Sequence, residues 1–176
     1  MNAPAGGGDH PVFTIGHSTR TFDELIGVLQ QHGITMLVDV RSRPHNPFLP
    51  QFNRDRMKMG LLDRGVVYTY LGDRLGRQPG GTPIAHRPSF DFMKIETSGA
   101  FQAGVEWLCT EARNSRLCLF CGEAEPGPCH RSFLIGQNLV KRGFRVLHIL
   151  PDGKLEEATP DLFHLPGGTD GNNPAC

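Results

Sequence analysis

The segment from residue 118 to residue 131 holds the side chains of this chain that are best suited to chemistry. Its first part, Cys118–Cys121, is a short apolar run, and a loop rich in glycine and proline follows. The loop ends in Cys129, His130 and Arg131, where an amphipathic helix is predicted to begin. A strand that leads through a loop into a helix directs backbone N–H groups and partial positive charge at that loop, which favours anions and thiolates. The segment therefore predicts a site for one of these groups.

Cys129 is the candidate nucleophile of this site. The helix dipole and the two basic residues that follow would stabilise its thiolate, which suits nucleophilic or redox chemistry. His17 and Glu123 are its candidate catalytic partners, because both side chains exchange protons or orient a reacting group. A structural interpretation stays open: Cys129 is then a small apolar loop residue, Arg131 ties the loop down, and Glu123 forms an ion pair with Arg41 or Arg131.

Metal binding by the same cysteines is an alternative. Cys121 and Cys129, together with His17, would form a small site for zinc or iron. Cys118 is unsuited to join Cys121, because residues three apart on an extended strand point to opposite faces. Partial motifs of this kind are weak indications of a metal, so the sequence predicts no cofactor and keeps zinc or iron as the alternative.

Strands and helices alternate along the chain and position these residues. Thr21 and Glu24 stand at capping-box spacing, and Asn53, Ser89 and Ser98 are further candidate helix caps. The expected strands are apolar or β-prone runs at 12–15, 34–40, 66–70, 116–120 and 145–150. This order predicts an α/β fold of the Rossmann-like kind: a single three-layer domain with a mostly parallel sheet of about five strands and helices on both faces.

The carboxyl ends of parallel strands meet at one edge of a sheet, and ligands bind there. Arg41 and Arg131 are expected to hold a small anionic ligand at this edge, either phosphorylated or nucleotide-like. Asp39 is expected to serve mainly structure. The substrate-binding set predicted from the strand ends is Ser18, Asp39, Arg41, Tyr70, His130 and Arg131.

Length and composition indicate how many domains the chain forms and where they end. Its 176 residues suit one domain over residues 11–165, between a flexible N-terminal segment (1–10) and a flexible tail (166–176) that are rich in small residues and proline. The stretch 72–88 is expected to be an irregular lid or binding loop. The five cysteines are unlike a secreted disulfide framework, and no segment approaches the roughly 20 apolar residues of a membrane span, so a cytoplasmic protein is expected. The oligomeric state stays open.

Charge favours a small ligand over nucleic acid. Basic and acidic residues are equal at 18 each, so no overall positive field attracts phosphate backbones. A local alternative is the basic stretch Arg54–Lys58 with Tyr68 and Tyr70, which suits phosphate contacts and base stacking. The leading hypothesis is a thiol-dependent transferase or hydrolase, and the alternatives are a metal-binding protein and a non-catalytic nucleic-acid-binding module.

Four motifs together resemble those of one known family. They are 14–18 (TIGHS), 38–42 (VDVRS) followed by Pro44, 70–72 (YLG) with Leu75 and Gly76, and C-x-E-x-x-P-x-x-C-H-R at 121–131. Their order and spacing resemble the YeaO-like family, domain of unknown function 488. One departure is Arg77, where the family often has a second glycine. The resemblance implies a single α/β domain and implies no settled activity.

Overall fold

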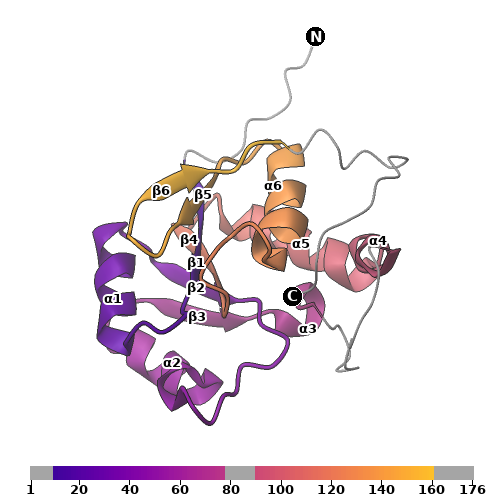
Figure 1. Cartoon of the computed structure of the whole chain (residues 1–176). Coiled ribbons are helices and arrows are strands. Elements are labelled where there is room, and N and C mark those ends of the chain that lie inside the picture. Colours follow the sequence, from indigo (N-terminus) through magenta and orange to yellow (C-terminus); the bar gives the residue numbers. More distant parts are fainter. Residues whose placement is uncertain (1–9, 78–89, 161–176) are drawn as a thin grey trace.

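The computed structural model describes residues 10–77 and 90–160, and these residues form an α/β fold around a six-stranded sheet (Figure 1). The strand order is β3-β2-β4-β1-β5-β6. All neighbouring strands are parallel except β5 and β6, which are antiparallel. The strands are β1 (Val12–Gly16), β2 (Met36–Asp39), β3 (Val67–Tyr70), β4 (Leu117–Cys121), β5 (Val146–Ile149) and β6 (Leu155–Glu157). The expected mostly parallel α/β sheet is confirmed, with six strands in place of about five.

Helices connect the successive parallel strands of the sheet. The last helical segment begins as a π-helix, Arg131–Gly136, and continues as α6 (Gln137–Lys141). A short 3₁₀ turn, Pro50–Phe52, precedes α2. The other helices are α1 (Phe22–Gln31), α2 (Arg54–Leu62), α3 (Gly72–Leu75), α4 (Phe90–Glu96) and α5 (Gly99–Glu111). None of the helices in the described part of the chain is long and apolar enough to cross a membrane.

Successive strand residues point to opposite faces of the sheet, and each face has its own buried cluster. On one face, Phe13, Leu37 and Phe120 pack with the buried residues of α1 and α2. On the other face, Val38 and Leu119 pack with residues of α3, α4, α5 and the π-helix with α6. The near-continuous apolar runs of the central strands follow from this burial on both faces.

Local signals in the sequence set several helix starts. Thr21 and Glu24 form the expected capping box at the start of α1, and Ser98 caps α5 by accepting a hydrogen bond from Phe101 N. Asn53 occupies the N-cap position of α2, but its side chain accepts a hydrogen bond from Asn46 N and does not cap the helix.

The less regular segments differ in part from what the sequence predicted. The expected loop begins with a helical turn, α3, and its residues 78–88 lie outside the described residues. The same holds for the tail 166–176, for Ser89, and for the N-terminal segment apart from His10. Strand β6 was not predicted, because all three of its side chains are exposed and it lacks the apolar alternation by which strands are recognised.

The strand order places β4 between β1 and β2, so the loop after β4 starts between two other strand ends. His17 N donates to the carbonyl of Cys121 at 3.0 Å, and Val40 N donates to the carbonyl of Phe120 at 3.0 Å. The residues that follow Cys121 therefore begin at the middle of the carboxyl edge of the sheet.

Candidate metal centre

The two ends of the cysteine loop, residues 121–129, come together on one face of the sheet. Cys121 is the last residue of β4 and belongs to the buried cluster on the α5 side. Cys118 belongs to the cluster on the opposite face, as the strand periodicity predicted. A turn closed by a hydrogen bond from Cys129 N to the carbonyl of Pro126 (3.0 Å) brings the chain back, and Cys129 joins the same cluster as Cys121.

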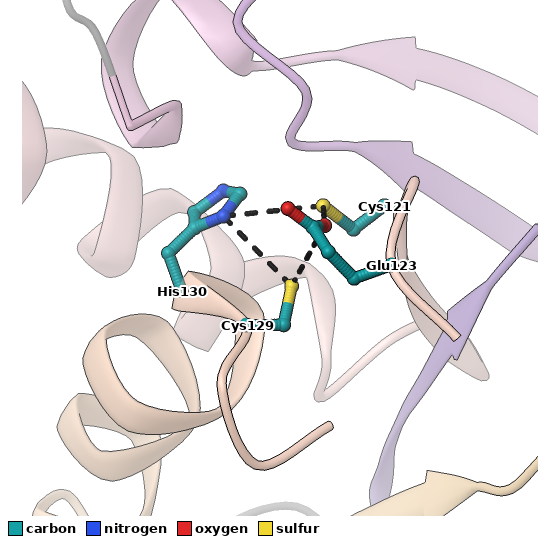
Figure 2. Close-up of side chains that lie close together, drawn as sticks. All are labelled: Cys121, Glu123, Cys129 and His130. Carbon is teal, nitrogen blue, oxygen red and sulfur yellow. Dashed lines mark hydrogen bonds between the residues drawn. The ribbon is translucent and has the colours of Figure 1, made fainter. Parts of the chain in front are cut away.

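Four side chains with metal-binding atoms meet at this point: Cys121, Glu123, Cys129 and His130 (Figure 2). One ligand atom from each lies within 4.8 Å of all the others. Both thiols donate to Glu123 Oε2, at 2.8 Å from Cys121 Sγ and 3.2 Å from Cys129 Sγ. His130 Nδ1 lies 3.9 Å from each sulfur. The four ligand atoms thus surround one small space.

His130 is oriented by the end of β2. Its Nε2 lies 3.1 Å from the carbonyl oxygen of Val40. Because a carbonyl oxygen only accepts, Nε2 carries a proton and donates it to Val40, and Nδ1 faces the two sulfurs. A histidine that ligates a metal through one nitrogen and donates from the other to a carbonyl is the common arrangement in metal sites.

The thiols and the carboxylate perturb one another. Burial alone would raise the pKa of Glu123, but the hydrogen bonds from Cys121 and Cys129 outweigh it and lower that pKa to about 2. The hydrogen bond from Cys121, with contributions from His130 and Arg131, lowers the pKa of Cys129 to about 5 in spite of burial. The pKa of Cys121 is raised by the same bond and by burial. The two thiols and the carboxylate therefore behave as one coupled group.

Arg131 fixes the cysteine loop through hydrogen bonds to backbone carbonyls of the loop. Its side chain is fully buried, and it donates from Nη1 to the carbonyl of Glu123 (2.7 Å) and from Nη2 to the carbonyl of Ala124 (3.0 Å). Gly16 makes room for this arrangement, because a Cβ there would lie 1.6 Å from the Glu123 carbonyl oxygen. Arg131 thus fixes the backbone of Glu123. The carboxylate of Glu123, for which an ion pair with an arginine was expected, contacts the two thiols instead.

A buried polar chain continues from Arg131 across the sheet. Arg131 Nε donates to Thr14 Oγ1 at 3.4 Å, and Thr14 Oγ1 lies 2.8 Å from His148 Nδ1. Ser132 Oγ lies 3.2 Å from the other ring nitrogen of His148. Burial, assisted by the charge of Arg131, lowers the pKa of His148 to about 4. This histidine is therefore a neutral member of the scaffold behind the cysteine loop.

His17 lies beside the cluster and outside it. Its ring stacks on Phe52, with centroids 4.5 Å apart, and its Nδ1 donates to the carbonyl of Ser18 at 2.9 Å. Its Nε2 faces Gly122, and burial lowers the pKa of the ring. Ser18 adopts a left-handed backbone with φ of 47°. The structure brings together the two cysteines of the alternative ligand set, Cys121 and Cys129, but not His17. Glu123 and His130 lie beside the two cysteines.

Asp39 and Arg41 form a buried ion pair at the end of β2. Arg41 donates to both carboxylate oxygens of Asp39, at 2.9 and 2.6 Å, and to the carbonyl of Phe52 at 2.7 Å. Tyr68 donates to Asp39 Oδ2 at 2.6 Å. Tyr70 donates to the carbonyl of Ser42 at 3.1 Å. The guanidinium of Arg41, like that of Arg131, is thus engaged by the protein itself.

The sequence motifs find a counterpart in a family model. The model, described as a domain of unknown function, DUF488, matches residues 21–137. The chain belongs to this family. The span matched by DUF488 contains all four residues of the cluster and ends before His148. No curated protein and no solved structure matches the chain.

Sequence reasoning found the cysteine loop of this DUF488 protein, and the structure gives two of the predicted residues other neighbours. Glu123, a candidate catalytic residue or arginine partner, contacts the two thiols, and His17 lies outside the cluster. The spacing in the sequence could have indicated the right partners, because Glu123 follows Cys121 by two residues and His130 follows Cys129 directly. When Cys121 and Cys129 come together at the two ends of the loop, Glu123 and His130 come together with them. The role of Tyr68 as a partner of Asp39 required knowledge that β3 lies beside β2.

Proposed function

We propose that this protein binds a metal ion, Zn²⁺, through Cys121, Glu123, Cys129 and His130. The observation that carries the proposal is the mutual approach of four ligand atoms from four side chains to within 4.8 Å. Two thiolates, an imidazole and a carboxylate are a donor set that zinc prefers, and soft sulfur disfavours magnesium and calcium. Iron is the second metal that this donor set accommodates.

Charge supports the same assignment. Two thiolates and a carboxylate outweigh a divalent ion by one negative charge, and the buried guanidinium of Arg131 beside the loop offsets it. Arg131 forms no ion pair with a carboxylate in the described residues; its partners are Glu123 O, Ala124 O and Thr14 Oγ1. A buried cation with only neutral partners is costly unless a negative centre lies nearby, and the metal centre supplies one.

The position of the cluster agrees with a functional metal. Helices on both faces of the sheet support a three-layer, Rossmann-like arrangement, in which ligand sites form beyond the carboxyl ends of the strands. The cysteines and His130 are buried, whereas Glu123 is partly exposed. The side of the centre that carries Glu123 is therefore the one that a water or a small ligand reaches.

A thiol-dependent enzyme that acts on a small anionic substrate is the second candidate. It is favoured by the lowered pKa of Cys129, because a thiolate is the reactive form of cysteine. Two features rank it below metal binding. Cys129 is only 1 % exposed, and Arg41 and Arg131, the groups expected to hold the anion, donate to carbonyl and carboxylate oxygens of the protein.

The test is the metal content of untagged protein purified without chelators, measured by inductively coupled plasma mass spectrometry. We expect close to one zinc ion per chain, and loss of most of it in Cys129→Ser and His130→Ala. Cys109→Ser is the matched control and keeps the metal, because Cys109 lies on α5 away from the cluster. Replacement by Co²⁺ should give a thiolate-to-cobalt charge-transfer band that Cys109→Ser retains.

Metal binding should also stabilise the fold. At a free zinc concentration about a thousand times the dissociation constant, the gain is roughly 4 kcal/mol, so a chelator should lower the melting temperature by about 10 °C. The control Cys109→Ser should show the same chelator effect. A protein that neither contains nor takes up zinc, iron or cobalt contradicts the proposal. Rapid alkylation of Cys129 at pH 6 would then favour the thiol enzyme.

A further inference from the structure

A pocket of about 510 Å³ lies between the start of α2 and the end of β3. Its lining includes Arg54 and Lys58 from the helix and Tyr68 and Tyr70 from the strand. It shares no residue with the cysteine cluster. The volume is within the range of about 300–1,000 Å³ that is typical of pockets for small molecules. We call it the α2–β3 pocket.

The positive charges of the α2–β3 pocket are available to a ligand. Arg54 and Lys58 lie four residues apart on α2 and so project from the same side of the helix. The Arg54 guanidinium carbon lies 4.4 Å from the ring centroid of Tyr70, which holds it against the wall. Neither cation forms an ion pair with another residue in the ranges 10–77 and 90–160. Asp55 also lines the pocket, so the charged lining has a net positive balance.

The walls of the pocket are fixed by hydrogen bonds that point away from it. Tyr68 donates to the buried carboxylate of Asp39, and Tyr70 donates to the carbonyl of Ser42. The side chain of Asn53, at the start of α2, is engaged by Asn46 N. The tyrosines therefore offer their ring surfaces as rigid walls, while Arg54 and Lys58 supply hydrogen-bond donors.

We propose that the α2–β3 pocket binds a small phosphate ligand, either the free ion or a phosphate monoester. Arginine pairs with phosphate in a two-pronged hydrogen-bonded geometry, and lysine adds a point charge. Tyrosine rings accept the flat or apolar part of such a ligand. A pocket of this volume suits one small molecule, and the equal numbers of basic and acidic residues disfavour a long nucleic-acid strand.

The binding test uses calorimetric titration at low ionic strength with three probes: adenosine 5′-monophosphate, ribose 5-phosphate and inorganic phosphate. Adenosine is the uncharged control. We expect saturable binding of phosphate-bearing probes and none of adenosine. Tightest binding of inorganic phosphate would make the free ion the ligand, and tighter binding of either ester would identify an organic phosphate; both outcomes support the proposal.

Variants of α2 test the assignment to the pocket. Arg54→Ala and Lys58→Ala should each weaken binding about tenfold, the effect of losing one charged hydrogen bond of roughly 1.4 kcal/mol. Arg56→Ala is the matched control on the same helix, because Arg56 does not line the pocket. Its affinity should equal that of the wild type.

Three results would overturn the proposal: no binding of any phosphate probe, an equal loss in Arg56→Ala, or a preference for a single-stranded oligonucleotide over the mononucleotide. The last would make the helix a nucleic-acid surface. The proposal is independent of zinc, since metal content and phosphate binding are measured separately and depend on different residues. If the phosphate proposal fails, the zinc proposal still stands, and the reverse also holds.

Discussion

The cysteine loop and the α2–β3 pocket use charged side chains in opposite ways. In the loop, the buried polar groups have partners within the protein: the thiols donate to Glu123, and Arg131 donates to backbone carbonyls. In the pocket, Arg54 stacks on Tyr70 and Lys58 is exposed, and neither is neutralised by a carboxylate in the described part of the chain. The contacts of the loop therefore contribute to the stability of the fold, whereas the cations of the pocket can still pair with a ligand.

This difference predicts which substitutions lower the stability of the fold and which change ligand binding alone. A buried group with several partners leaves those partners unsatisfied when it is removed, and the cost falls on stability. An exposed cation loses little when it is truncated, so its removal changes binding alone. The two regions should therefore respond differently to the same kind of mutation.

The largest expected effect is that of Arg131→Met. The change keeps much of the volume but leaves the carbonyls of Glu123 and Ala124 without their donors. We expect the free energy of unfolding to fall by about 4 kcal/mol, because hydrogen bonds to a charged group contribute roughly 1.5–3 kcal/mol each. Urea denaturation measures it. Arg145→Met is the control: its ion pair with Glu157 is exposed, and a much smaller loss is expected. Equal losses would contradict the comparison.

A smaller effect is expected from pH, through His148. Its pKa is about 4 in the folded protein and 6.5 as the ordinary value, because burial disfavours the charged ring. Between these values the unfolded chain takes up a proton that the folded protein does not, so stability falls as pH decreases from 6.5 to 4. We expect this histidine to account for about 2 kcal/mol of that loss.

Denaturation of two histidine variants at pH 7 and pH 5 isolates this contribution. His148→Gln keeps a polar side chain beside Thr14 and Ser132, and it should show a shallower dependence on pH than the wild type. His45→Gln, which changes an exposed residue of the α2–β3 pocket, should keep the wild-type dependence. Identical pH profiles for all three proteins would show that His148 does not stay neutral in the folded state.

The smallest effects should come from the pocket. Tyr70→Phe removes one partly buried hydrogen bond to Ser42 O and should cost about 1 kcal/mol. Lys58→Ala should change stability by less than about 0.5 kcal/mol, because the side chain is exposed. Thermal unfolding compares both with the wild type. A Lys58→Ala protein as destabilised as Arg131→Met would remove the distinction between the two regions.

Much of the fold could be predicted because its signals are local. The capping box of Thr21 and Glu24, the cap at Ser98 and the buried runs of β1, β2 and β4 depend on residues close in sequence. The exceptions have physical reasons. Strand β6 is exposed and pairs only at the edge of the sheet, and the Asn53 side chain finds the amide of Asn46 in place of its own helix.

The candidate site was predicted in part. Cys129, Glu123, His130 and Arg131 were all singled out, because unusual residue types gather at a helix start. Their partners were not, since a contact depends on the direction of each side chain and on which strands are neighbours. Arg41 was expected to hold a ligand, and the structure adds that it forms an ion pair with the buried carboxylate of Asp39, two residues away.

The sequence by itself determined the alternation of strands and helices, the two-sided burial of the sheet and the loop that carries the cysteines, because these depend on the periodicity and chemistry of neighbouring residues. Only the tertiary structure decided which groups meet. Strand order placed β4 between β1 and β2, and this brought Val40 O to His130 and Thr14 to Arg131, residues about 90 and 117 positions apart. Contacts over such separations are set by strand pairing and packing, which local periodicity does not specify.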